Sequence, residues 1–283
     1  MVKDNLTIDN DILELEGVSE FRNDNCNYYT YNDTPVPRVS HILQQCRDSN
    51  WLIQWAANIG RRKYDYYTEK ALTVGTIAHE IIDEYLKIKY NAPTQGFTYM
   101  NKNFHVNYDL IEFEYRDQVF NVVENFKNWE KGLSAYNTYI DEVIAIELPV
   151  VCPWYGGTVD AILRINGAVY LCDFKTSKSI NPEYLLQVSA YKWIIDNGYI
   201  SGIPHIDGVG ILRMEKSRIT SVDDLFINDF DIHGHNMIVN YTQCFFAYLE
   251  AYYRTININY ITKQYHPNPD FYFGKGEINE KAS

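Results

Sequence analysis

The sequence predicts an α/β fold with a helical N-terminal layer, and two patterns lead to this expectation. Apolar residues recur at helical spacing through the first half of the chain, and strand-like runs begin near Val143, followed by a further helix, strand and helix. Apolar side chains make up 46% of the 283 residues, beside 15 glycines and 9 prolines, which is the balance of a folded protein. Intrinsic disorder is therefore excluded.

The first half of the chain is expected to be mostly helical. Residues 1–33 are acidic and rich in asparagine and predict an irregular lead-in, and we expect a single domain over 34–283. Within this domain 34–140 is the mainly helical part. Helical periodicity covers 40–70, Thr76 is placed to cap a second helix that ends near Asn91, and a third helix follows at about 108–133 after a polar loop at 94–108.

The second half, 141–283, is expected to hold the sheet and a C-terminal helix. A strand is predicted at 143–148, before Pro149, and two β-rich runs flank Asn166-Gly167, the favoured dipeptide of a type I′ hairpin turn. Asn181 and the following proline mark the start of a helix, for which Gly198 is a plausible stop. A strand at 208–213 and a helix at 239–253 complete the order.

Composition narrows the classes of partner and compartment. Lys and Arg number 25 against 37 Asp and Glu, so the formal charge of −12 repels polyanions on average, and contacts with nucleic acid would have to be local. The five cysteines include no CxxC pair, which argues against a disulfide framework or a thiolate zinc site. With no apolar export or membrane segment visible, we expect a cytoplasmic protein that does not enter membranes.

The predicted hairpin brings two aspartates together. If Ile165 faces Ala168 across the turn, counting outward places Asp160 opposite Asp173. The same count places one apolar set on a single face of the hairpin: Val159, Ala161, Leu163, Tyr170, Cys172 and Phe174. It also places Lys175 opposite Thr158 on the face of the aspartates. Like charges directly opposite one another are destabilising, so positive charge is expected to offset them. Lys175 supplies one such charge, as in an ordinary Lys–Asp ion pair, and a divalent cation would supply two; oxygen ligands suit Mg²⁺ or Mn²⁺ better than Zn²⁺.

Several short motifs now stand in a specific order: Gly75-Thr76-Ile77-Ala78-His79-Glu80, Glu147, Gly157-Thr158-Val159-Asp160, Asp173-Phe174-Lys175-Thr176 and Gln187-Val188-Ser189-Ala190-Tyr191. This order resembles the PD-(D/E)XK nuclease superfamily, in particular its RecB-like and Cas4-like branch, which includes mitochondrial genome maintenance exonucleases and phage exonucleases. The resemblance implies a restriction-endonuclease-like core, a central mixed β-sheet flanked by helices. The sequence departs from the family name at one position, because Val159 precedes Asp160 in place of proline.

The resemblance also implies a metal site. Asp160 and Asp173 would bind one or two Mg²⁺ or Mn²⁺ ions, helped by His79 and by the backbone carbonyl of Phe174, and Glu147 would serve a second metal or a water. An iron–sulfur cluster is not expected, because it needs four thiolates and only Cys244 lies in the C-terminal part.

Three further residues complete the implied catalytic set. Lys175 would orient or activate the attacking water, and Gln187 and Tyr191, four residues apart on one helical face, would support the site or hold a phosphate. Other candidate phosphate contacts are Arg61-Arg62-Lys63, Lys178, Lys192, Arg213, Lys216 and Arg218. Trp51 and Trp55 are assigned to the core, although they could stack on unpaired bases.

The function that this implies is a metal-dependent DNA nuclease, favoured as an exonuclease on single strands or DNA ends in replication, recombination or repair. Two alternatives remain open: a DNA endonuclease, and an inactive nucleic-acid-binding or assembly module with the same fold. A metalloprotease is disfavoured, because the partial HExxH pattern that begins at His79 has Asp83 in place of the second histidine. Protein partners remain undefined.

Overall fold

The computed structural model describes residues 28–46, 50–92 and 106–259. The strands are β1 (Tyr28–Tyr31), β2 (Thr34–Pro37), β3 (Ile140–Val151), β4 (Gly156–Ile165), β5 (Ala168–Lys175), β6 (Gly208–Arg213) and β7 (Asp223–Asn228). The helices are α1 (Val39–Cys46), α2 (Asn50–Ile59), α3 (Arg61–Tyr90), α4 (Phe113–Leu133), α5 (Pro182–Asp196) and α6 (Ile232–Asn259). Short 3-10 turns, η1 (Tyr108–Leu110) and η2 (Ser134–Tyr136), flank α4.

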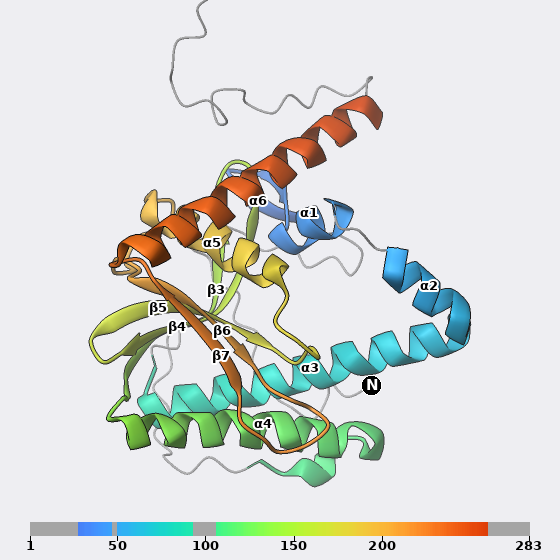
Figure 1. The fold of residues 1–283 in the computed structure, drawn as a ribbon, viewed down its shortest axis with the longest axis vertical. Helices are drawn as coiled ribbons and strands as arrows, with labels where there is room; N and C mark the ends of the chain where they lie inside the picture. Colours follow the sequence, from blue (N-terminus) through green and yellow to red (C-terminus); the bar gives the residue numbers. More distant parts are fainter. Residues whose placement is uncertain (1–27, 47–49, 93–105, 260–283) are drawn as a thin grey trace, which may run out of the picture.

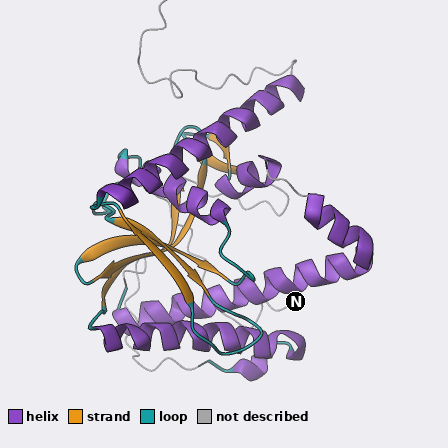
Figure 2. Ribbon diagram, in the orientation of Figure 1, coloured by secondary structure: helices purple, strands orange, loops and turns teal. Residues whose placement is uncertain are grey.

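A five-stranded mixed sheet forms the centre of the molecule, with the strand order β3-β4-β5-β6-β7. All neighbouring strands are antiparallel except β5 and β6, which are parallel and are joined through the helix α5. Figure 1 shows α3 and α4 on one side of this sheet and α5 and α6 on the other. The expected α/β architecture, a mixed central sheet flanked by helices, is therefore confirmed, and Figure 2 shows how the strands are enclosed.

Each face of the sheet has its own apolar core. Under α3 and α4 the buried side chains include Ile82, Leu86, Val122, Phe126, Leu163, Phe174 and Leu212. Under α1, α5 and α6 they include Ile42, Ile162, Leu171, Val188, Ile211 and Phe245. A separate pair of strands, β1 and β2, packs Tyr29 and Val36 against Val151. Because both faces of the sheet are buried in apolar cores, the sheet is held rigidly between the helices. The polar residues that the strands carry are therefore held in defined positions as well.

The N-terminal helices break at a different place from the predicted one. A single helix, α3, runs through Thr76, and the break lies at Gly60, whose φ of 80° is accessible to glycine. Continuation through Thr76 keeps Val74, Ile77 and Ala78 in the same buried core, so tertiary packing outweighs the local capping signal. The predicted helix end near Asn91 is confirmed, since Asn91 is the left-handed C-cap.

Several strand predictions also need adjustment. β1 begins at residue 28, inside the segment expected to be irregular, whereas residues 1–27 and most of the loop predicted at 94–108 lie outside the described residues. β3 continues through Pro149, which an edge strand tolerates because its outer side needs no ladder donor. The sequence patterns did not predict β7 and predicted too short a helix for α6.

Among the described residues, no helix is long and apolar enough to cross a bilayer.

Candidate metal centre and lysine site

The β4–β5 hairpin has the predicted register near its turn. Ile165 pairs with Ala168, Leu163 with Tyr170, and Ala161 with Cys172. Asn166 and the following glycine both have positive φ, as a type I′ turn requires. The register that the turn residues predict is therefore confirmed for the part of the hairpin next to the turn.

Beyond Ala161 the hairpin departs from the prediction. The paired ladder ends at Ala161 and Cys172, so Asp160 and Asp173 do not form a cross-strand pair, and the Asp160 carboxylate instead accepts a hydrogen bond of 2.6 Å from the Phe174 backbone N–H. Val159, expected on the face of Ala161, packs in the opposite core under α5. Strict alternation of side chains is lost where β4 leaves the β5 ladder.

Glu147 reaches the site from β3 through an unusual backbone conformation. Its neighbours Ile146 and Leu148 pair with Ala161 and Val159, which places Glu147 beside Asp160 on the adjacent strand. The φ of Glu147 is 49°, in the left-handed region that non-glycine residues rarely occupy inside a strand. Local backbone strain thus accompanies the placement of this carboxylate.

His79, Glu147 and Asp160 form a group that could hold a metal ion. Each offers one ligand atom, and these atoms all lie within 4.8 Å of one another, with the side chains partly exposed. His79 Nδ1 lies 3.9 Å from an Asp160 oxygen, and α3 positions the imidazole by burying Ala78 and Ile82 beside it. Three of the residues implied as metal ligands are therefore brought together from α3, β3 and β4.

Burial governs the protonation of His79. It lowers the pKa of the imidazole to about 4, and the nearby Lys175 ammonium adds to this effect, while Asp173 and a hydrogen bond with the Phe174 backbone oppose it. At neutral pH the imidazole is uncharged, which is the form that can ligate a metal. Phe174 itself packs its ring edge-to-face with that of His79.

Asp173 and Lys175 form a second part of the site. The Lys175 ammonium lies 2.7 Å from the Asp173 carboxylate, and Asp173 is not a member of the group of metal-ligand atoms described above. Burial raises the pKa of Asp173 to about 6, with Lys175 opposing and Asp160 adding to the shift. Burial alone would lower the pKa of Lys175, but Asp173 and Asp160 outweigh it and the pKa is raised.

Gln187 and Tyr191 extend the site from α5, on one helical face as predicted. The Lys175 ammonium lies 3.4 Å from the Gln187 side-chain oxygen, and the Gln187 amide donates to the Tyr191 hydroxyl at 3.2 Å. Gly157 lets Tyr191 approach, because a Cβ at Gly157 would lie 2.3 Å from the tyrosine ring. All of the candidate catalytic side chains therefore belong to one connected region.

Asp83 is a site residue that entered the sequence analysis only as a mismatch to the HExxH pattern. It lies one turn after His79 on α3, its side chain is buried, and its Oδ1 atom has no hydrogen-bond partner. Burial, together with Glu147 and Asp160, raises the pKa of Asp83 well above its usual value. The four-residue spacing from His79 was the available signal, since it puts both side chains on one face of the helix.

Two of the candidate phosphate contacts have other roles. Lys192 is buried on α5 and pairs with Asp196 and Asp229 at 2.5 and 2.7 Å, so it is not free to meet a phosphate. Arg213 is likewise buried and pairs with Asp223 and Glu215.

The structure tests the assignment to the core for one of the two tryptophans. Trp55 is 38% exposed and makes one edge-to-face and one tilted ring contact with tyrosines of α3, contrary to its assignment to the core. The side chain of Trp51 lies outside the described residues.

The sequence was compared with protein-family models and with curated proteins, and neither comparison gives a match.

Proposed function

We propose that the chain is a divalent-metal-dependent DNA nuclease with the restriction-endonuclease-like core of the PD-(D/E)XK superfamily. The observation that carries this proposal is the position of Asp160 between two groups. Its carboxylate is a member of the cluster with His79 and Glu147, and it also accepts a hydrogen bond from the backbone N–H of Phe174, the residue between Asp173 and Lys175. A cation site beside a fixed ammonium is the arrangement that phosphodiester hydrolysis requires.

The donor set fits Mg²⁺ or Mn²⁺. Carboxylate oxygens predominate, and the single imidazole is neutral at physiological pH. One carboxylate oxygen nearby, Asp83 Oδ1, is buried without a hydrogen-bond donor. A bound divalent cation would supply a nucleophilic water near neutral pH and counter-charge for the phosphate oxygens. His79, Glu147 and Asp160 would hold it, with Asp173 beside them.

Lys175 supplies a positive charge that exists before substrate binds. Asp173 and Gln187 hold its ammonium in place, and the raised pKa keeps it protonated at neutral pH. In this site the ammonium stabilises the charge that develops on the phosphate as water adds to phosphorus and the P–O bond to the leaving oxygen breaks. Gln187 and Tyr191 fix the direction in which Lys175 points.

The expected substrate is DNA, with an exonuclease acting on single strands or free ends favoured by the resemblance to RecB-like and phage enzymes. A test uses labelled linear single-stranded, linear double-stranded and closed circular DNA, each with Mg²⁺, Mn²⁺ or EDTA. We expect the linear substrates to be degraded from their ends only when metal is present. Cutting of closed circles would indicate an endonuclease, and metal-independent binding without cleavage would indicate an inactive binding module.

Variants assign the activity to this site. Asp160→Asn and Lys175→Ala should each lower the cleavage rate at least about 100-fold, the order seen when a single charge-stabilising group is removed. Asp117→Asn and Lys131→Ala are matched controls, because both parent side chains are exposed on α4. Full activity in both site variants would refute the assignment.

A further inference from the structure

Two loops leave the central sheet at the edge where Lys175 lies. β5 and β6 are parallel, and Lys175 is the register partner of Arg213, so the segments after these two strands emerge at the same edge. One loop, 176–181, leads to α5, and the other, 214–222, joins β6 to β7. The Met214 backbone N–H donates to the Lys175 carbonyl at 2.8 Å, which fixes the start of the second loop beside the site.

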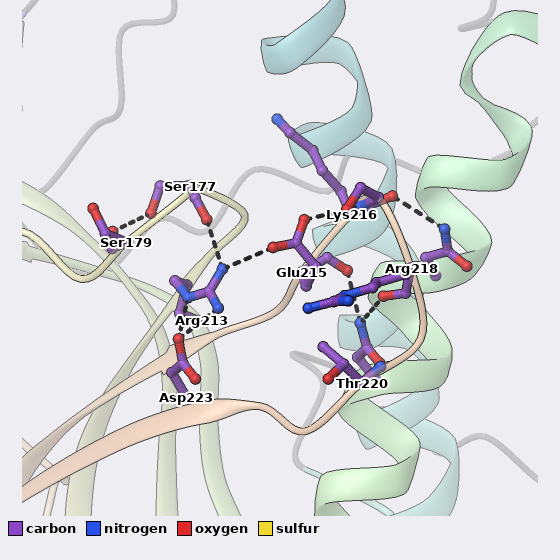
Figure 3. A network of polar contacts seen from close by, with 11 residues as sticks. Ser177, Ser179, Arg213, Glu215, Lys216, Arg218, Thr220 and Asp223 are labelled. Atoms are coloured by element: carbon purple, nitrogen blue, oxygen red, sulfur yellow. Dashed lines mark hydrogen bonds and ion pairs between the residues drawn. The ribbon is translucent and has the colours of Figure 1, made fainter.

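Arg213 ties the two loops together. Its guanidinium donates to the Ser177 carbonyl of the first loop at 3.1 Å and to Glu215 of the second at 3.4 Å. Asp223 at the start of β7 holds the other side of the guanidinium at 2.6 Å. Figure 3 shows this network spanning both loops. The buried arginine thus fixes the relative positions of the loops.

Asn125 holds the second loop against α4. Its side-chain amide donates to the carbonyls of Glu215 and Arg218, at 2.7 and 3.0 Å, and its side-chain oxygen accepts from the Thr220 N–H at 2.7 Å. Asn121, one turn earlier on α4, donates to the Lys216 carbonyl at 3.1 Å. These bonds use the backbone of the loop, so the side chains of Lys216 and Arg218 take no part in them (Figure 3).

Three cations on these loops, Lys178, Lys216 and Arg218, define a basic rim. Lys178 and Arg218 are exposed, Lys216 is half-buried, and none of the three forms an ion pair with a carboxylate of the described residues. Burial lowers the pKa of Lys216, Glu215 opposes the shift, and the charge of Lys178 adds to it, so the two lysines repel each other. The chain has a net charge of −12, so three cations that form no ion pair among the described residues are a local exception.

We infer that the basic rim binds the phosphate backbone of the DNA strand that enters or leaves the Lys175 site. The inference rests on the proposed nuclease function for its choice of ligand. A row of phosphates would neutralise the three cations, and the rigid loop backbone would hold them in place before binding. The rim therefore positions the strand and adds affinity, whereas the chemistry stays with the residues around Asp160.

The experiment measures binding of a fluorescent oligothymidylate to the full chain in EDTA, where metal-dependent cleavage is absent, across a series of KCl concentrations. For single strands the slope of log K against log salt falls in magnitude by about 0.7 for each phosphate that the protein no longer neutralises. We expect this decrease for each of Lys178→Ala, Lys216→Ala and Arg218→Ala, and a decrease of about 2 for the triple variant. Lys131→Ala is the matched control, since it lies about 15 Å along α4 from Asn121 at 1.5 Å per residue.

A second measurement separates this inference from the proposed function. Hydrolysis of the small substrate thymidine 5′-(p-nitrophenyl phosphate) with Mn²⁺ should be unchanged in the triple variant, because that ester is too short to reach the rim. An unchanged salt slope in the triple variant, or no binding by the parent chain, overturns the inference whatever the cleavage assays give. A decreased slope in a chain that cleaves nothing would support the rim and reject the nuclease.

Discussion

At the scale of single residues, Asp83 and Glu147 each lower the stability of the folded protein at this site. Glu147 occupies a left-handed backbone conformation inside a strand, and Asp83 is buried with one carboxylate oxygen lacking a donor. Each feature destabilises a folded protein by about 1–3 kcal/mol. Both features lie at the cluster that contains His79 and Asp160, so the cost in stability is concentrated at the candidate metal site.

Asp83→Asn should stabilise the metal-free protein increasingly as pH rises. The folded-state pKa of Asp83 is raised, so the stability that its protonated form contributes is complete at low pH and is lost as pH increases through that pKa. Asparagine does not ionise, so the variant keeps its stability as pH rises. At the alkaline end of the range its free energy of unfolding should exceed that of the parent protein by about 1–3 kcal/mol. Thermal melts in EDTA from about pH 5 to 9 measure this difference. A gap that is constant with pH, or that also appears in Asp117→Asn, would contradict it.

The β4–β5 hairpin and α5 show which elements a sequence can predict. Asn166 and its glycine set the turn type and hence the register, and Asn181 with the following proline set the start of α5, because both signals are local. The prediction failed beyond Ala161, where Asp160 turns to the Phe174 N–H, and at Thr76, which lies inside α3. In both places tertiary contacts decide the outcome, a hydrogen bond across the hairpin at Asp160 and core packing around Thr76, and the local sequence pattern does not predict them.

The contact between β4 and α5 is tested by Gly157→Ala. The added Cβ would meet the Tyr191 ring at 2.3 Å, and overpacking of this kind costs about 1–3 kcal/mol. Urea unfolding should show that cost in the parent background and a smaller one when Tyr191→Ala is also present. Gly132→Ala is the control, since a Cβ there meets nothing within 4 Å. Equal costs in both backgrounds would mean that the tyrosine is not the obstacle.

For the molecule as a whole, the candidate metal ligands come from three separate elements. His79 lies on α3, Glu147 on β3 and Asp160 on β4, so a cation bound by all three would link the helical layer to the sheet. The order of motifs in the sequence indicated this assembly only through a family resemblance. Spacing along the chain could not show that β7 completes the sheet.

Divalent metal should therefore stabilise the entire fold. At a free Mn²⁺ concentration 100 times the dissociation constant, the expected gain is about 2.7 kcal/mol relative to EDTA. Differential scanning fluorimetry should show a rise in Tm of roughly 5–10 °C for a chain of this size. The rise should disappear in Asp160→Asn and persist in Asp117→Asn; a rise of equal size in both would place the cation elsewhere.

The parallel pairing of β5 with β6 has a consequence for how the protein folds. A hairpin such as β4–β5 closes a very short loop, whereas β6 joins β5 only after the chain has passed through α5 and returned. We expect the hairpin carrying Asp160 to form early and the loops bearing the basic rim to settle late. During synthesis, the acidic centre would then exist in a nascent chain before the cations that border it.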